Sequence, residues 1–404
     1  MDKTLGIYIH IPFCDRAKCP YCDFYSVPYR EDEAEEYTGA LCAQIKRAAP
    51  GAAGRKADTV YFGGGTPSLI GNGLNKILDC VAANFALAPG AEITAEANPG
   101  ACPAETLQEL RAGGFNRLSL GMQSAQPDEL RALGRRHTPE DVTRAFGDAR
   151  DAGFGNISLD LMLAVPGQTR DTLAGSLDFI SALAPEHVSA YLLTLEPGTL
   201  FYKKRGELAL PDDDGQAEMY AFACRKLEEA GFAQYEISNF SRPGFESRHN
   251  LKYWDCREYL GFGPGAHSFF KGRRYYYPRS LRDFMTAPRT LDDGAGGSLG
   301  EYVMLRLRLA QGLGEAALRE RYGRGLDIFP ADRLAPLVGA GLVRADRVSL
   351  KLTRKGMLVS NSVIGELIEA LGEQTETLGE QTETLREQTE ALGEQTESHS
   401  SGEK

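Results

Sequence analysis

The feature that most constrains the fold is a repeated alternation of β-rich and helical sequence. Six short β-rich runs end in Gly, Pro or polar residues: LGIYIHIPF (5–13), TVYFGGG (59–65), EITAEANPG (92–100), RLSLGMQS (117–124), NISLDLMLAVPG (156–167) and HVSAYLLTLEPG (187–198). Helical patterns such as DEAEEYTGALCAQIKRA and PDELRALG lie between them. This alternation is typical of a parallel sheet covered by helices. It predicts an α/β fold whose six units form an open or closed barrel, with a doubly wound sheet as the alternative.

Residues with unusual chemistry follow the predicted strands. A group of cysteines comes after the first run, GGGTP ends the second, and Glu96 ends the third. Active sites of parallel barrels lie at the carboxyl ends of the strands. We therefore predict a single site at that end.

Three of the eight cysteines, Cys14, Cys19 and Cys22, lie within nine positions. A disulfide, a zinc site and an iron–sulfur cluster are the competing interpretations. A closed zinc site needs a fourth Cys or His, and the nearby His10 lies on the strand that precedes Cys14. A 4Fe–4S cluster held by protein alone needs a fourth cysteine, and position 24 is Phe24. Three thiolates would leave one iron open to a small molecule; the residues favour this interpretation and leave the other two open.

The composition bears on location and partners. The net charge is −11, whereas a non-specific nucleic-acid binder needs a basic surface. No run approaches the roughly 18 apolar residues of a membrane helix, and the N-terminus has no signal-peptide layout. We expect a cytoplasmic protein with no transmembrane segment and no nucleic-acid partner. In a reducing cytosol, clustered cysteines more often form a metal or redox site than a disulfide.

The turn-rich stretch TAPRTLDDGAGGSLG predicts a domain boundary. Helical patterns and then the alternating run LVRADRVSLKLTRKGMLV follow it, which predicts a small winged-helix-like α+β unit. The predicted domains are a barrel at 1–285, a linker at 286–300, a C-terminal domain at 301–368 and an acidic heptad-repeat tail at 369–404.

The tail repeats every seven residues, with one leucine in each repeat. A coiled coil needs two apolar positions per heptad, and glycine in three of the four repeats weakens a helix. We expect a disordered acidic tail, and a weak helical oligomerisation element is the alternative. The repeated leucines are Leu371, Leu378, Leu385 and Leu392.

Seven motifs carry a resemblance to a known family. In chain order they are YIHIPFC…CPYCDF, YFGGGTPS, EANPG, LSLGMQS, LGRRHT, DLMLAVPGQT and HNLKYW…GFGPGAHS. With them the chain resembles the radical S-adenosylmethionine (SAM) proteins related to oxygen-independent coproporphyrinogen III oxidase, and among these the haem chaperones of the HemW type. The resemblance runs from about residue 5 to 365 and leaves only the repeat tail uncovered.

The resemblance implies a radical-SAM partial (β/α)6 barrel and a HemN-type C-terminal domain. It also implies a 4Fe–4S cluster on Cys14, Cys19 and Cys22 whose open iron SAM caps. The implied cofactor contacts are Tyr8, Tyr21, Gly64, Gly65, Thr66, Glu96, Gln123, Arg135 and Asp160. These residue types suit the task, because glycines admit close backbone approach, carboxylates accept hydrogen bonds from hydroxyl or amino groups, and arginine pairs with a carboxylate. Each also has an alternative role: the glycines could form an ordinary tight turn, and Glu96 and Asp160 could cap helices or lie in solvated loops. Arg135 could be a surface charge, and Tyr8 could pack in the core.

The sequence departs from the family pattern at two places. Four residues separate Cys14 from Cys19, where the family has three, and one extra residue must bulge outward. Loops absorb insertions at small cost, so a longer gap is compatible with a cluster. Leu163 and Ala164 also stand where the family usually has an aromatic residue and a glycine.

Two features favour the chaperone branch over the oxidase branch. The oxidases carry a fourth cysteine where this chain has Phe24. The chaperones carry a His-Asn-x-x-Tyr-Trp motif, matched here by His249, Asn250, Tyr253 and Trp254. Imidazole binds haem iron and aromatic rings pack on the macrocycle, so these four residues are the haem-site candidate, with a packed, hydrogen-bonded corner as the alternative.

The leading hypothesis is a haem chaperone that hands haem to apo-haemoproteins such as cytochromes. It would do so with transient membrane-protein contact and as a homodimer. One alternative is a radical SAM enzyme that oxidatively decarboxylates coproporphyrinogen III or modifies another tetrapyrrole. A third is a degenerate scaffold that holds no cluster.

Overall fold

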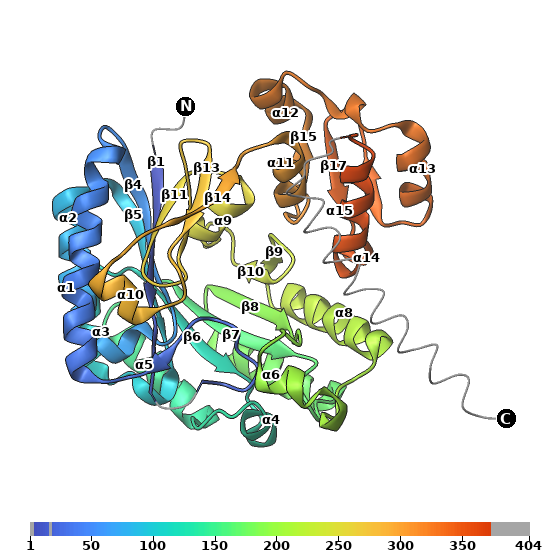
Figure 1. Ribbon diagram of the computed structural model, residues 1–404. Coiled ribbons are helices and arrows are strands. Elements are labelled where there is room, and N and C mark those ends of the chain that lie inside the picture. Colours follow the sequence, from blue (N-terminus) through green and yellow to red (C-terminus); the bar gives the residue numbers. More distant parts are fainter. Residues whose placement is uncertain (1–3, 16–17, 373–404) are drawn as a thin grey trace. The chain divides into compact units, whose positions relative to one another are not determined.

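The computed structural model describes residues 4–15 and 18–372. Contacts divide the chain into two units, the first ending at Gly297 and the second beginning at Ser298 (Figure 1). This division falls inside the turn-rich stretch 286–300. The expectations for the repeat tail and for the bulge between Cys14 and Cys19 concern residues 373–404 and 16–17, which lie outside the described residues.

The first unit is built on one large sheet whose centre confirms the predicted α/β fold. Six consecutive strands pair in parallel with their neighbours in chain order. They are β1 (Thr4–Ile11), β4 (Lys56–Gly64), β5 (Ala86–Ala97), β6 (Arg117–Gln123), β7 (Ile157–Leu163) and β8 (His187–Leu192). Each predicted run therefore became one strand, and all six carboxyl ends lie at one edge of the sheet.

The sheet continues past both outer strands of this set. Beyond β1 lie β11 (Tyr259–Phe262), β12 (His267–Phe270), β13 (Arg273–Tyr276) and β14 (Leu291–Ala295); beyond β8 lie β10 (Asn239–Ser241) and β9 (Ala233–Gln234). Strand β11 is parallel to β1, whereas the other added strands pair antiparallel. The sequence analysis missed them because strands of two to five residues show too little alternation to identify.

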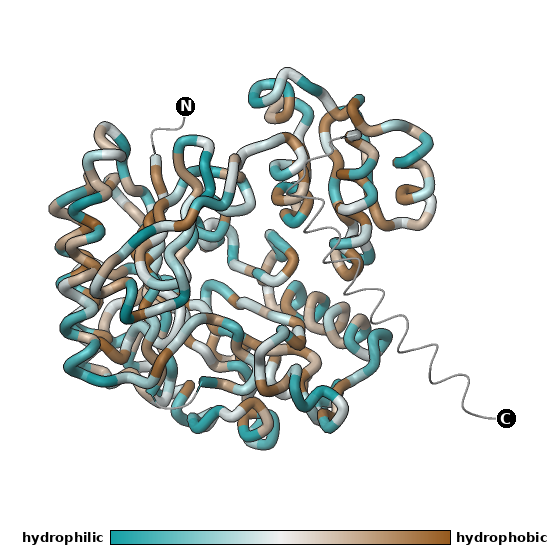
Figure 2. The backbone as a smooth tube through the Cα atoms, in the orientation of Figure 1, coloured by the Kyte–Doolittle hydropathy of each residue, from teal (hydrophilic) through white to brown (hydrophobic). Residues whose placement is uncertain are grey.

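Helices follow the strands (Figure 1). They are α1 (Glu31–Ala48), α2 (Gly73–Asn84), α3 (Ala104–Ala112), α4 (Pro127–Ala132), α5 (Pro139–Asp151), α6 (Arg170–Leu183), α7 (Leu200–Lys203), α8 (Asp213–Glu229), α9 (Arg248–Trp254) and α10 (Leu281–Thr286). Along α1, apolar and polar segments alternate with the helical turns (Figure 2), and Ala34, Tyr37, Leu41 and Ile45 form its buried face. A stripe at this spacing is what a helix covering a sheet requires.

Alternation along β1 sorts its side chains between two environments. Ile7, Ile9 and Ile11 are completely buried, whereas Tyr8 and His10 lie on the opposite face. Because successive residues of a strand point to opposite faces, this arrangement is the one that the sequence predicts.

The second unit has helices and a small antiparallel sheet in the order β15-β17-β16, which confirms the predicted α+β domain. Its elements are α11 (Leu299–Arg306), β15 (Leu313–Gly314), α12 (Glu315–Tyr322), α13 (Ala331–Gly339), β16 (Val343–Ala345), β17 (Ser349–Leu352), α14 (Arg354–Leu358) and α15 (Ser360–Glu369). Across the described residues of both units, no helix is both long and apolar enough to cross a membrane.

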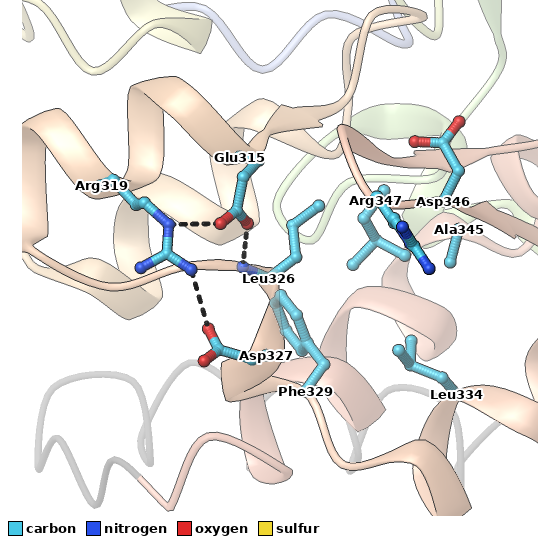
Figure 3. Close-up of a pocket in the computed structure, with 10 residues that line it drawn as sticks. Glu315, Arg319, Leu326, Asp327, Phe329, Leu334, Ala345, Asp346 and Arg347 are labelled. Atoms are coloured by element: carbon cyan, nitrogen blue, oxygen red, sulfur yellow. Dashed lines mark hydrogen bonds and ion pairs between the residues drawn. The ribbon is translucent and has the colours of Figure 1, made fainter.

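A pocket of about 320 Å³ lies in the second unit (Figure 3). Leu326 and Phe329 supply apolar walls, and Arg319 on its rim is paired with Glu315 and Asp327. Neither histidine nor cysteine is among the described residues that line it. The pocket therefore offers neither a thiolate nor an imidazole, and the predicted cluster, cofactor and haem residues lie in the first unit.

Candidate functional site

The cysteine segment begins where β1 ends and is anchored at both of its own ends. Strand β2 (Phe13–Cys14) pairs with β3 (Val27–Pro28). In addition, the Val27 amide donates to the Pro12 carbonyl at 2.7 Å, and the Tyr29 amide donates to the Cys14 carbonyl at 2.7 Å. The segment from Cys14 to Pro28, which we call the cysteine loop, is thus held over the carboxyl edge of the sheet.

The glycine-rich turn after β4 binds the backbone of the residues that lead into the cysteine loop. The Gly65 amide donates to the Ile11 carbonyl at 2.8 Å, and the Thr66 amide donates to the Phe13 carbonyl at 2.7 Å. A Cβ atom on Gly65 would lie 2.4 Å from the Phe13 carbonyl oxygen, and Gly64 has φ of +118°. Both positions therefore require glycine, for close approach and for backbone conformation respectively.

Cys14, Cys19 and Cys22 are free thiols, and all three are partly exposed. Burial raises the pKa of Cys14 and of Cys22, and the neighbouring thiol of Cys19 raises both further. The three sulfurs are therefore near one another, although within the described part of the chain no three His, Cys, Asp or Glu side chains are arranged to hold a metal ion. Their role as cluster ligands stays a prediction.

His10 does not complete a four-ligand zinc site in this arrangement. Its Nδ1 shares a hydrogen bond with the Tyr8 hydroxyl at 3.0 Å, and its Nε2 hydrogen-bonds the Tyr25 carbonyl at 2.8 Å. Burial lowers the pKa of His10 to about 4. With both ring nitrogens engaged, the donor set at this edge is three thiols from one loop, which fits a cluster with an open iron better than closed tetrahedral zinc.

Two carboxylates face the same side of the sheet. Glu96 accepts hydrogen bonds from the Tyr61 hydroxyl at 2.8 Å and from the Gly64 amide at 3.1 Å. Asp160 accepts from the Ser119 hydroxyl at 3.1 Å. Burial raises the pKa of Glu96 to about 7. The hydrogen bond from Tyr61 opposes this rise in pKa, and the negative charge of Asp160 adds to it. Burial also raises the pKa of Asp160 to about 6, against the hydroxyl hydrogen bonds that it accepts.

Arg135 links the cysteine loop to these strand ends. Its Nε donates to the Tyr21 hydroxyl at 3.1 Å, and its Nη1 donates to Asn98 Oδ1 at 3.4 Å. Its positive charge acts on both Asp160 and Cys14, where it opposes the rise in pKa caused by burial. A guanidinium in this position could pair with the carboxylate of a bound amino acid.

The remaining predicted cofactor residues lie close to this group. The Tyr8 ring stacks on Tyr61 with centroids 6.3 Å apart. Gln123 ends β6 with φ of +65° and is buried. The structure thus places the nine predicted residues on one face or at one edge of the sheet, while their contacts with a cofactor stay predictions.

The departure at Ala164 has a visible consequence. Ala164 adopts φ of +58°, the left-handed region that favours the glycine usual in the family. Its amide donates to Gln168 Oε1 at 2.6 Å. That hydrogen bond stabilises a conformation that costs an L-residue roughly 1–2 kcal/mol.

The haem-site candidate lies elsewhere. Thr59 Oγ1 hydrogen-bonds His249 Nδ1 at 2.8 Å, and the Tyr253 hydroxyl hydrogen-bonds Nε2 at 2.8 Å. The His249 ring also stacks on Tyr61 at 5.2 Å, and burial lowers its pKa to about 3. Because Thr59 belongs to the first half of β4, His249 lies toward the amino ends of the strands, away from the cysteine loop.

This geometry matches the packed, hydrogen-bonded corner that was the alternative for the motif. The Asn250 amide donates to the Ser247 hydroxyl oxygen at 3.4 Å, which caps α9, and Trp254 ends this helix half-buried. His249 presents no free ring nitrogen to iron in this conformation. A role of the four motif residues in haem binding stays a prediction that would require them to change partners.

The sequence analysis missed two residues of the site. Tyr61 holds Glu96 and stacks on both Tyr8 and His249. Arg117 is 2% exposed and lies within electrostatic reach of Tyr61 and Asp160. A charged residue that opens the otherwise uncharged run RLSLGM was the available signal for Arg117.

Comparisons with known proteins agree with the architecture. Residues 8–180 match the model of the Radical SAM superfamily, and residues 299–359 match the HemN C-terminal domain. The chain is 38% identical over 379 residues to the heme chaperone HemW of Bacillus subtilis (strain 168), covering 90% of this chain and 99% of the relative. The heme chaperone HemW of Escherichia coli (strain K12) is 35% identical, with 89% and 97% covered. Among solved structures, the radical SAM enzyme coproporphyrinogen III oxidase (HemN) from Escherichia coli has a TM-score of 0.77 at 25% identity, covering 92% of this chain and 90% of that one.

The raised pKa of Glu96 predicts a pH dependence of stability. Its pKa is about 7 in the folded chain, against an ordinary value of 4.5. Between these values the folded state binds more protons than the unfolded state, so the free energy of unfolding falls as pH rises through this window. Between about pH 5 and pH 8, the free energy of unfolding of Glu96→Gln should therefore fall less than that of the unmodified protein. The difference should be up to about 3 kcal/mol, because one pKa unit corresponds to about 1.4 kcal/mol.

Denaturant unfolding of the ligand-free protein at both pH values measures this difference. Glu36→Gln, at an exposed position on α1, is the matched control and should leave the pH dependence unchanged. An equal fall in Glu96→Gln and in the unmodified protein would contradict the assignment.

Proposed function

This chain belongs to the HemW family of haem chaperones, and from that premise we propose that it binds haem and transfers it to apo-haemoproteins. The observation that carries the proposal is similarity over nearly the whole length of curated relatives, 99% of the Bacillus subtilis chaperone and 97% of the Escherichia coli chaperone. Such similarity includes the second unit and the His-Asn-x-x-Tyr-Trp segment as well as the barrel. A shared barrel alone would support only a common fold.

Membership in the radical SAM superfamily adds a 4Fe–4S cluster and SAM as cofactors. Such a cluster, when bound, would supply one electron to SAM. In this chain Cys14, Cys19 and Cys22 would hold the cluster. Position 24 is Phe24 and supplies no fourth thiolate, which is compatible with a cluster that has one open iron.

The residues beneath the cysteine loop would bind and orient SAM. Arg135 would pair with the SAM carboxylate, and Glu96 with its ammonium group or a ribose hydroxyl. A cationic partner would also favour the ionised form of Glu96, whose pKa burial raises to about 7. Asp160 would accept a second hydrogen bond, and the bare backbone at Gly65 permits close approach.

Enzymatic oxidation of coproporphyrinogen III is the less favoured alternative. The similarity to the Escherichia coli oxidase is 25% in sequence and chiefly one of fold. Phe24 replaces the fourth cysteine of the oxidase branch, and its side chain is 66% exposed. An apolar ring on the surface of the cysteine loop suits contact with a partner or an apolar ligand better than cluster ligation.

The proposed setting is the cytoplasm, where a reducing environment keeps the three thiols available. The acceptors would be apo-haemoproteins such as cytochromes. Transient contact with membrane-bound acceptors and a homodimer also belong to the proposal.

Cluster binding is tested by the substitution Cys19→Ala. Anaerobic reconstitution of the unmodified protein should give iron and sulfide in the amounts of one 4Fe–4S cluster per chain. The visible spectrum should then show the absorption band of such clusters. Cys19→Ala should lose most of both, because two thiolates do not hold the cluster. Cys42→Ala, far from the loop in sequence and on α1, is the control and should keep them. Iron and sulfide near zero in the unmodified protein would instead indicate a scaffold that holds no cluster.

The function itself is tested by comparing haem binding with turnover. A titration with ferric haem, followed at the Soret band, should saturate near one haem per chain. The cluster-loaded protein, incubated anaerobically with SAM, a reductant and coproporphyrinogen III, should form no more than about one product molecule per chain. Absence of saturable haem binding together with protoporphyrinogen formed over many turnovers would replace the chaperone by the enzyme.

A further inference from the structure

The topology of the added strands places one histidine beside the cysteine loop. In the parallel pair β1 and β11, Ile9 lies opposite Phe262, so the two strands end at the same edge of the sheet. The chain then turns through residues 263–266 and starts β12 at His267. His267 therefore lies at the carboxyl edge of β1, the edge from which the cysteine loop extends.

His267 differs from the other histidines in its exposure. Of the six histidines, one lies in the tail outside the described residues, and four are buried with ring hydrogen bonds: His10, His137, His187 and His249. His267 is exposed as a residue, and neither of its ring nitrogens hydrogen-bonds a described residue. Among the described histidines it is the one that can bind an external metal without first breaking a hydrogen bond.

The surroundings of His267 suit a flat anionic ligand. Tyr276 lies directly opposite it on β13, and the two rings are stacked with centroids 4.9 Å apart at 19°. Partial burial and the charges of Arg274 and Arg279 lower the pKa of His267, with Asp293 opposing. The lowered pKa favours the neutral imidazole, which is the form that binds iron.

The same surface is tied to the cysteine loop. Arg279 pairs with Asp23 at 3.2 Å, and Asp23 lies between Cys22 and the exposed Phe24. Both partners of this ion pair are well exposed, so the guanidinium remains accessible to another anion. Haem offers iron, an apolar macrocycle and two propionates, and this surface offers an imidazole, aromatic rings and arginines.

We propose that His267 is the protein ligand to the iron of the haem cargo, with the edge of the Tyr276 ring toward the macrocycle and Arg274 and Arg279 near the propionates. This inference rests on the proposed function and replaces His249 as the iron ligand. It places the cargo at the same edge of the sheet as the predicted cluster, whereas His249 lies toward the opposite edge.

The test is a ferric haem titration of four proteins: the unmodified chain, His267→Ala, His267→Cys and Lys271→Gln. His267→Ala should weaken binding at least tenfold. His267→Cys should bind haem with the Soret and electron paramagnetic resonance signature of thiolate ligation, because the new side chain would take the position of the imidazole. Lys271→Gln, exposed in the turn after β12, is the matched control and should bind as the unmodified chain does.

Thermal unfolding of each variant shows whether it folds; a surface position makes large losses unexpected. If the unmodified protein saturates with haem while His267→Ala binds equally well and His267→Cys keeps the unmodified spectrum, the assignment of His267 is overturned and the proposed function stands. If the unmodified protein shows no saturable binding, the proposed function fails, and the inference fails with it.

Discussion

The site depends on one close approach of backbone to backbone, where the glycine-rich turn after β4 meets the start of the cysteine loop. The amides of Gly65 and Thr66 donate to carbonyls at the end of β1 and the start of β2. A side chain at Gly65 would collide with the Phe13 carbonyl. These hydrogen bonds set the height of the cysteine loop above the sheet, and thereby the distance between its thiols and the residues on the strands below. Without them, three cysteines on an irregular loop would have no fixed relation to Glu96 or Arg135.

The sheet face beneath the cysteine loop holds polar groups that a purely structural core would not need. Glu96, Asp160 and Arg117 lie on adjacent strands, and burial raises the pKa of both carboxyls. Keeping such groups out of water is unfavourable unless they have partners. Hydroxyls from Tyr61 and Ser119 satisfy part of that requirement, and a bound cofactor with hydroxyl, ammonium and carboxylate groups would satisfy more of it. Carboxyls with shifted pKa values are typical of functional sites, and here they lie on the strands beneath the cysteine loop.

The sequence predicted the parts of the molecule that repeat or carry dense local signals. Six β-rich runs with helices between them became six parallel strands in chain order, because alternation over many residues leaves few other ways to bury the apolar positions. The face of β1 that holds Tyr8 and His10 followed from its period of two. Short strands such as β11 and β12 did not follow, since their identity depends on pairing with β1, which is distant in sequence.

The same limit applies to the histidines. Residue type and spacing made His249 a candidate, but whether its ring nitrogens are occupied depends on Thr59, almost two hundred positions earlier, and on Tyr253. His267 sits in the motif GFGPGAHS, yet its place beside the cysteine loop follows only from the parallel pairing of β11. Contacts between segments far apart in the chain thus decided which histidine is accessible.

The central claim, that the chain delivers haem, is tested most directly by the kinetics of transfer. Haem-loaded protein would be mixed with the apo form of a b-type cytochrome, and the Soret band of the acceptor followed over a range of acceptor concentrations in excess. A chaperone that hands haem over in a complex predicts a transfer rate that rises with acceptor concentration and exceeds the rate of spontaneous haem loss. A rate equal to that of spontaneous loss at every acceptor concentration would mean passive release, and would contradict the account.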